Sequence, residues 1–147
     1  MKTVYLYTDG SCLSNPGPGG WCAILVYGDH EKMISGGESE TTNNRMELTA
    51  ILKGLQALKE PCEVVLTSDS KYALDSLENG WALRWKQNGW KKSKKENALN
   101  PDLWDKILCE IEKHSMKYLW VKGHAGHSYN ERCDTEAQAQ ASRYSSK

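Results

Sequence analysis

The hydrophobic pattern changes its period partway along the chain, and this change constrains the fold more than any other feature. In the first part, β-branched, aromatic and aliphatic side chains gather in short segments at residues 3–8 and 21–27, and more weakly at residues 32–38. Short segments of this composition between turn signals are typical of strands. Turn-forming stretches rich in Gly, Pro, Asn and Asp separate the segments. We therefore expect an antiparallel meander of three strands.

Beyond these segments the apolar spacing becomes helical and then alternates between strand and helix. Leu and Ile recur every three or four positions from Leu48 to Leu58, which predicts a helix, with Asn43 and Asn44 as candidates for its N-cap. Further strands are expected at residues 63–68 and 116–121, and further helices at residues 71–77, from Pro101 onward and at residues 130–143. This order predicts an α/β fold with a mixed sheet and helices on both faces.

Length and composition indicate one globular domain. A chain of 147 residues fits a single domain over residues 1–147, and its six Trp and seven Tyr residues favour a buried core over disorder. The chain has 19 basic and 19 acidic residues, so its formal net charge is zero. Proteins that bind nucleic acids usually carry an excess of Lys and Arg, so the total charge alone argues against such a partner.

The sequence predicts a cytoplasmic protein that does not associate with membranes. No apolar run reaches the roughly 20 residues that cross a bilayer, and Asp9 comes too early for a secretory signal. The five cysteines are odd in number and contain no C-x-x-C pair, which favours reduced thiols over disulfides or zinc ligands. No heptad seam is visible, so we expect a monomer.

Four acids are placed where they could form one site. Asp9 ends the first expected strand, Asp69 ends the strand at residues 63–68, Glu47 lies in the first turn of the first long helix, and Asp134 lies early in the last helix. If the first and fourth strands are neighbours, Asp9 and Asp69 meet at the carboxyl ends of the sheet, where open α/β sheets place their sites. Four gathered carboxylates need cations, and their hard oxygen ligands suit Mg²⁺ or Mn²⁺.

Each acid also has a purely local explanation. Asp9 could be a turn residue, and Asp69 could cap the helix that follows it. Glu47 lies three positions after Asn44 and could complete a capping box, whereas Asp134 could interact with the dipole of its helix. The four positions form no short motif, so the residues alone suggest a metal site without establishing one.

Six stretches of the sequence resemble bacterial ribonuclease HI, in order and over nearly the whole chain. They are YTDGSC (7–12), NPGPGG (15–20), TTNNRMEL (41–48), TSDS (67–70), WVKGHAGH (120–127) and NERCD (130–134). The resemblance implies a five-stranded mixed sheet, an antiparallel three-strand meander plus two parallel strands, flanked by helices. It also implies endonucleolytic cleavage of the RNA strand in an RNA–DNA hybrid, which leaves 5′-phosphate and 3′-hydroxyl ends.

The resemblance assigns roles to five residues. The metal-binding acids of the family map onto Asp9, Glu47, Asp69 and Asp134, and the histidine of its mobile loop maps onto His124. We expect two Mg²⁺ ions during catalysis, with Mn²⁺ as the alternative, one activating water and the other stabilising the leaving 3′ oxygen. We expect His124 to serve in proton transfer or product release, because an unperturbed imidazole titrates near pH 6.5. A surface histidine in a glycine-rich loop is the alternative.

The family also places part of its substrate surface in this sequence. By resemblance, Cys12, Asn15, Asn43 and Asn44 lie along the hybrid, and Thr42 belongs to a pocket for a phosphate of the DNA strand. Helix capping is the alternative for the two adjacent asparagines, and a small buried thiol is the alternative for the cysteine. Some family members carry a basic residue two positions before the threonine. Here that residue is Glu40, which weakens the expectation for the pocket.

A basic segment at residues 84–95 contains six basic residues and no acid. The family has a basic protrusion here, over about residues 81–99, that grips phosphates, and Trp81 lies near its base. A solvated cationic face with tryptophans packed beneath it is the alternative. We expect the tryptophans mainly to pack the protrusion and the lysines to contact phosphate. The candidate substrate contacts in this segment are Trp81, Trp85, Lys86, Trp90, Lys91, Lys92, Lys94 and Lys95.

The zero net charge is then the average of two opposed regions. Outside residues 84–95 the chain has six more acidic than basic residues, and part of that excess is the expected carboxylate site. The distribution of charge supports an RNA–DNA hybrid partner although the total does not. Two other functions stay open, a non-catalytic hybrid-binding module and a transposase- or resolvase-type nuclease on the same fold.

Overall fold

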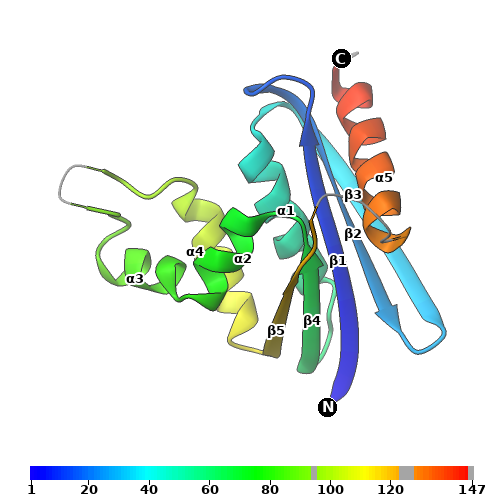
Figure 1. Cartoon of the computed structure of the whole chain (residues 1–147), viewed down its shortest axis with the longest axis horizontal. Helices are drawn as coiled ribbons and strands as arrows, with labels where there is room; N and C mark the ends of the chain where they lie inside the picture. Colours follow the sequence, from blue (N-terminus) through cyan, green and yellow to red (C-terminus); the bar gives the residue numbers. More distant parts are fainter. Residues whose placement is uncertain (94–95, 123–127, 146–147) are drawn as a thin grey trace.

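A computed structural model describes residues 1–93, 96–122 and 128–145 (Figure 1). The strands are β1 (Lys2–Cys12), β2 (Gly17–Tyr27), β3 (His30–Thr41), β4 (Cys62–Ser68) and β5 (Ser115–Trp120). The helices are α1 (Asn43–Gln56), α2 (Lys71–Glu78), α3 (Trp81–Gln87), α4 (Pro101–Ile111) and α5 (Ser128–Ser145). Among the described residues, no helix is long and apolar enough to span a membrane.

The five strands form one mixed sheet in the order β3-β2-β1-β4-β5. β1, β2 and β3 pair antiparallel, whereas β4 pairs parallel to β1 and β5 pairs parallel to β4. The expected meander plus two parallel strands is therefore confirmed. β1 and β4 are neighbours, which is the condition that the metal-site hypothesis required.

Helices cover both faces of the sheet. One face packs against α1, α2 and α4 in a core that includes Leu6, Leu66, Ile51 and Trp104, all buried. On the opposite face α5 lies across the antiparallel strands, where Cys133 and Ala137 pack against β2 (Figure 1). Because α5 packs on β1 and β2, the last helix is brought to the same sheet as the first strand.

The structure corrects two expected boundaries. The N-cap of α1 is Thr42, whose Oγ1 accepts a hydrogen bond from the Arg45 N–H at 3.2 Å, so Asn43 and Asn44 are helical residues and not caps. Residues 17–20, expected in a turn, begin β2. A Cβ at Gly20 would lie 2.2 Å from the Ala137 carbonyl oxygen, so the glycine allows α5 to approach the strand closely. The glycines here serve packing and not chain reversal.

Helix α3 was not expected from the sequence. It has seven residues, begins after Gly80 at a positive φ of 75° and has no side-chain N-cap hydrogen bond. A segment this short shows no full apolar period, and it takes its stability from packing against its neighbours.

The five cysteines are all free thiols, in agreement with the expectation from their spacing.

Candidate active site

Asp9 and Asp69 lie where the parallel pairing of β1 and β4 stops. The last paired residues are Tyr7 and Thr67, beyond which β4 ends at Ser68 and the chain turns into α2. The expectation that β1 ends at Asp9 is wrong. The strand continues to Cys12 because β2 still pairs with it. One side of β1 is thus unpaired at Asp9, and this leaves room for side chains from other elements.

Glu47 reaches the site because α1 rests on the backbone of β1. A Cβ added at Gly10 would lie 2.4 Å from the Glu47 nitrogen and 2.5 Å from the Met46 carbonyl carbon. No side chain other than hydrogen fits such an approach. Since α1 begins at Asn43, Glu47 lies beyond the first turn and does not form a capping box with Asn44.

Asp9, Glu47 and Asp69 form a compact carboxylate cluster. One oxygen from each residue lies within 4.8 Å of the others. Asp9 is only 2% exposed, and Glu47 Oε2 is buried with no hydrogen-bond donor within the part of the chain that the structure describes. A buried carboxylate oxygen of this kind is costly unless it is paired. The cluster therefore suits a hard divalent cation, because it offers closely spaced carboxylate oxygens and one of them is buried without a hydrogen-bond donor among the described residues.

The electrostatics of the cluster lead to the same conclusion. Burial, followed by the negative charge of Asp69, raises the pKa of Asp9 to about 8. Burial and the charges of Asp9 and Asp69 raise the pKa of Glu47 well above its ordinary value, although the Gly10 backbone N–H partly offsets this effect. Without a cation these groups favour the protonated form. A bound cation would favour the ionised form, because it supplies positive charge beside these carboxylates.

The fourth acid, Asp134, comes from α5 and lies beside Asp9. Its charge and a hydrogen bond to it contribute to the raised pKa of Asp9, behind the effects of burial and Asp69. Gln138 Nε2 donates to Asp134 Oδ2 at 2.8 Å, and the neighbouring Cys133 Sγ donates to the Tyr7 carbonyl at 3.4 Å. The structure thus brings all four acids together, with Asp134 outside the tight three-residue cluster. His124 lies outside the described residues.

The substrate candidates after β1 and at the start of α1 share one surface. Asn15 Oδ1 accepts a hydrogen bond from the Asn43 N–H at 3.2 Å, which joins the loop to the helix start. Cys12 is partly exposed, and its Sγ donates to carbonyls of the loop and of Thr41. Asn43 and Asn44 are exposed. Because Thr42 performs the capping, the side chains of both asparagines are available for other contacts.

Helix α3, which carries the start of the basic segment, lies on the side of the molecule away from the antiparallel strands (Figure 1). Tryptophans of the segment pack against the core. The ring of Trp85 packs edge-on against that of Trp104, with centroids 6.2 Å apart, and Trp90 also packs against the main core. Trp81 is 38% exposed. The packing expected for Trp85 and Trp90 is thus present, and it fixes the base from which the segment projects.

The lysines of the basic segment are not equivalent. Lys86 Nζ lies 2.9 Å from Asp105 Oδ1, so its charge is already paired within the protein. Lys92 Nζ lies 5.9 Å from the centre of the Trp85 ring, at the distance of a cation–π contact. Lys91 is exposed. Lys94 and Lys95 lie outside the described residues. Among the described lysines, Lys91 and Lys92 are the better candidates for phosphate contacts.

Two residues beside the site were missed by the sequence reasoning. The Trp120 indole Nε1–H donates to the Asp69 carbonyl oxygen at 3.1 Å, and Lys71 Nζ lies 5.6 Å from the centre of the Trp120 ring. Trp120 ends β5, the strand next to the one that Asp69 follows. An aromatic residue at the end of an expected neighbouring strand is the signal that could have indicated it.

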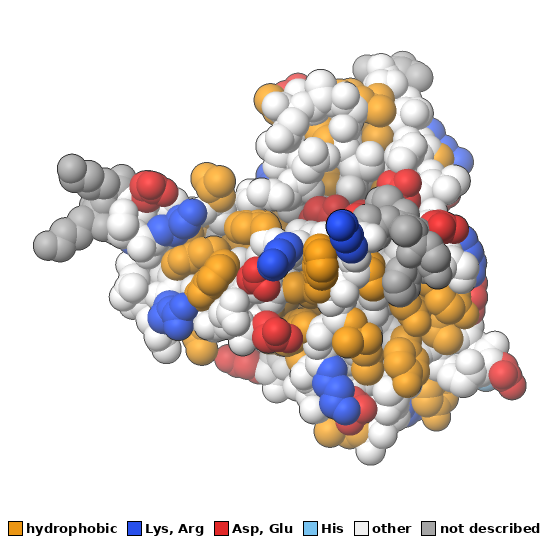
Figure 2. Space-filling model, viewed as in Figure 1, with side chains coloured by type: hydrophobic (Ala, Val, Ile, Leu, Met, Phe, Trp, Pro, Cys, Tyr) orange, Lys and Arg blue, Asp and Glu red, His pale blue; other side chains and the backbone are white. Residues whose placement is uncertain are grey.

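The molecular surface has a hollow that contains acidic side chains. Figure 2 shows acidic side chains in a hollow near the centre of the view, with basic and hydrophobic side chains along its rim. An anionic centre with a cationic rim is the arrangement expected for a metal-assisted reaction on a phosphodiester.

Sequence comparisons relate the whole chain to one family. A family model described as RNase H matches residues 1–142. The chain is 52% identical over 143 residues to a ribonuclease H from Syntrophus aciditrophicus, a match that covers 97% of this chain and 83% of that protein. It is 50% identical over 144 residues to a ribonuclease HI from Neisseria meningitidis serogroup B, with 98% and 99% covered.

Solved structures show the same likeness in three dimensions. A crystal structure of LC9-RNase H1, a type 1 RNase H with the type 2 active-site motif, superimposes with a TM-score of 0.86 at 30% identity, covering 98% of this chain and 74% of that one. LC11-RNase H1, in complex with an RNA/DNA hybrid, has the same fold, with a TM-score of 0.73 at 19% identity and 95% and 97% covered. The chain belongs to the ribonuclease H family.

Proposed function

We propose that this protein is a metal-dependent endonuclease that hydrolyses the RNA strand of RNA–DNA hybrids and leaves 5′-phosphate and 3′-hydroxyl ends. The observation that carries the proposal is the buried cluster of Asp9, Glu47 and Asp69, whose oxygens lie within 4.8 Å of one another. Family membership and the hybrid bound by LC11-RNase H1 supply the substrate class. A non-catalytic binding module would have no reason to gather three acids, two of them buried, whose charges oppose one another.

The acids are proposed as metal ligands, with Mg²⁺ as the ion and Mn²⁺ as the alternative. When bound, two such ions supply an activated water and a stabilised leaving oxygen for in-line displacement. Asp9, Glu47, Asp69 and Asp134 would hold the ions, and Gly10 keeps Glu47 beside Asp9 by allowing α1 to approach β1. His124 is proposed to move a proton or to assist product release.

Substrate binding is proposed to use two surfaces on either side of this cluster. Cys12, Asn15, Asn43 and Asn44 would read the hybrid, where the 2′-OH of the RNA strand distinguishes it from DNA. Thr42 would contribute to a DNA-phosphate pocket, although Glu40 weakens such a pocket. The basic protrusion, residues 81–99, would hold the phosphate backbone on the other side. We propose a cytoplasmic monomer, in keeping with the five free thiols.

The direct test compares labelled RNA–DNA, DNA–DNA and RNA–RNA duplexes of one sequence, with Mg²⁺, with Mn²⁺ and with EDTA. We expect endonucleolytic cleavage of the RNA strand in the hybrid alone, and only with metal. Binding without cleavage would establish the non-catalytic module instead. Cleavage of the DNA–DNA duplex would favour a transposase- or resolvase-type nuclease.

Neutralising the exposed lysines of the basic segment is expected to weaken substrate binding. In the double variant Lys91→Gln/Lys92→Gln, KM should rise several-fold while kcat stays near its normal value. The salt dependence of log KM should flatten by about 0.7–0.9 for each phosphate that the variant no longer neutralises. Steady-state kinetics at several salt concentrations measure both quantities. Lys53→Gln, which removes an exposed charge on α1, is the control. An unchanged salt slope in the double variant would contradict the assignment.

Replacing His124 with Ala is expected to lower kcat by roughly 100-fold, a typical contribution of a positioned acid–base group, with a smaller change in KM. His127→Ala is the matched control, because His127 precedes the last helix and has no assigned role. Single-turnover and steady-state measurements together separate loss of chemistry from slow product release. Equal rates in the two variants would remove His124 from the mechanism.

A further inference from the structure

Trp120 contacts both Asp69 and Lys71. Its indole Nε1–H donates to the Asp69 carbonyl oxygen at 3.1 Å, and on its ring face lies Lys71 Nζ, 5.6 Å from the ring centre. Trp120 is 50% exposed, so burial of its ring is not the main reason for a tryptophan here. One contact is to the turn between β4 and α2, at Asp69, and the other is to Lys71, the first residue of α2.

That turn is held from several sides. The Val121 N–H donates to the Ser68 carbonyl at 3.0 Å, and the Ser70 N–H donates to Ser68 Oγ at 3.0 Å. Ser70 Oγ in turn accepts from the Ala73 N–H and caps α2. These bonds fix the residues on both sides of Asp69. The Trp120 bond acts on the peptide of Asp69 itself, so it limits rotation about the backbone that aims the carboxylate.

The ring contact holds a cation whose residue, Lys71, lies two positions after Asp69 in the chain. Lys71 begins α2 and its side chain is exposed, so its ammonium would be free to move if the ring did not hold it. A cation within about 6 Å of an indole centre is attracted by the negative face of the ring. Such a cation is suited to a phosphate of a nucleic-acid strand that reaches Asp69.

We propose that Trp120 is a positioning residue that aims the Asp69 carboxylate through its indole N–H and holds Lys71 in place as a substrate phosphate contact. The inference rests on the proposed function, because it takes Asp69 as a metal ligand. Its two halves make separable predictions. Removal of the N–H affects metal binding and turnover, whereas removal of the ammonium affects substrate binding.

The test compares Trp120→Phe, which removes the N–H and keeps an aromatic ring, with Lys71→Gln. For Trp120→Phe we expect kcat at subsaturating Mg²⁺ to fall about fivefold and the Mg²⁺ midpoint to rise by a similar factor, with KM nearly unchanged. For Lys71→Gln we expect KM to rise about threefold and the slope of log KM against log salt to fall by about 1, with the Mg²⁺ midpoint unchanged. Mg²⁺ binding is also measured without substrate, from the metal-dependent rise in the thermal midpoint.

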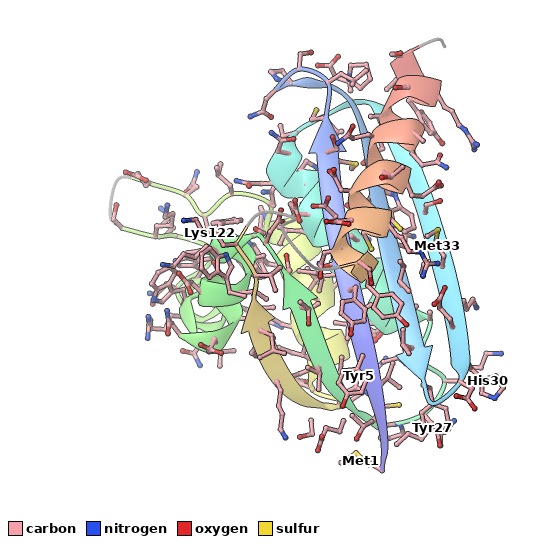
Figure 3. All side chains as sticks on the ribbon, turned by 45° about the vertical axis from the view of Figure 1, so that its right-hand side comes forward. Met1, Tyr5, Tyr27, His30, Met33 and Lys122 are labelled. Carbon is pink, nitrogen blue, oxygen red and sulfur yellow. The ribbon has the colours of Figure 1, made fainter. Side chains whose placement is uncertain are left out.

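Tyr5→Phe is the control, because Tyr5 is a half-exposed aromatic residue of β1. Figure 3 shows Tyr5 well away from Lys122, which follows the carboxyl end of β5. A normal Mg²⁺ midpoint in Trp120→Phe would overturn the positioning role, as would equal losses of stability with and without metal. A normal KM in Lys71→Gln would overturn the phosphate contact. Asp69→Asn is assayed in parallel. Near-normal cleavage by that variant would overturn Asp69 as a metal ligand. Absence of hybrid cleavage by the wild-type protein would overturn the proposed function itself, so the two failures are distinguishable.

Discussion

Replacing Asp9 with Asn is expected to abolish Mg²⁺-dependent cleavage and, at the same time, to stabilise the metal-free protein. The buried carboxylate has a pKa raised to about 8 from 3.8, so ionising it in the folded state is unfavourable. Between these two pH values the metal-free folded protein keeps Asp9 protonated while the unfolded chain ionises it, so the free energy of unfolding falls as the pH rises. Asn has a similar shape and no charge, so it removes the penalty.

The expected gain for Asp9→Asn is about 1–3 kcal/mol near neutral pH, or several degrees in the thermal midpoint. Melting curves in EDTA at pH 5 and pH 7.5 measure it, and the difference between variant and wild type should be larger at pH 7.5. Added Mg²⁺ should raise the midpoint of the wild type much more than that of the variant. Turnover should fall on the order of 1,000-fold or more.

The control for this variant is Asp29→Asn, which removes an exposed acid from the turn between β2 and β3. It should change neither the midpoint in EDTA nor the rate. A variant at Asp9 that cleaved hybrids near the normal rate would end the metal assignment. An unchanged thermal midpoint of Asp9→Asn in EDTA would show that the raised pKa of Asp9 does not lower the stability of the folded protein.

Replacing Gly10 with Ala is expected to damage the site without touching a functional side chain. The added Cβ would lie 2.4 Å from the Glu47 nitrogen and 2.5 Å from the Met46 carbonyl carbon, both backbone atoms that cannot turn aside. Helix α1 must therefore shift away from β1. We expect a loss of about 1–3 kcal/mol in the free energy of unfolding, typical of overpacking. Displacement of Glu47 should lower kcat by roughly 100-fold.

Gly54→Ala is the matched control for Gly10→Ala. Gly54 also lies in α1 against β1, but its new Cβ would meet Leu6 Cδ1 at 2.6 Å, the far end of a flexible side chain. This variant should lose stability by a similar mechanism while it keeps kcat and the Mg²⁺ midpoint. Chemical unfolding and kinetics on the three proteins separate the two effects. If both variants lost stability and neither lost activity, the close approach would be structural only.

Much of the fold was predictable because the strand-like and helical apolar patterns of the sequence are strong. The short apolar segments at the start and the helical spacing from Leu48 predict the meander and α1, and the run at residues 63–68 predicts a buried strand. The adjacency of β1 and β4 was a condition of the site hypothesis, and the structure meets it by bringing Asp9 and Asp69 together. The grouping of Glu47 and Asp134 with them came from resemblance, because contacts between elements so far apart in the chain leave no local pattern.

The features that the sequence did not predict depend mainly on contacts between helices and strands. The short helix α3 has too few residues for a period, and the pairing of Lys86 with Asp105 depends on α3 packing beside α4. The N-cap of α1 falls on Thr42 and not on the adjacent asparagines, although both residue types cap well. The role inferred for Trp120 depends on β5 lying next to β4, which only the assembled sheet shows.

The packing of α5 on β1 has a consequence for synthesis of the protein. Asp134 lies in the element that follows all the others in the chain, whereas its neighbour Asp9 lies in the element that precedes them. A nascent chain whose α5 is still inside the ribosome lacks Asp134 at the sheet and cannot complete the four-acid group. An RNA-cleaving site that requires Asp134 would therefore be assembled only after translation has passed the last helix.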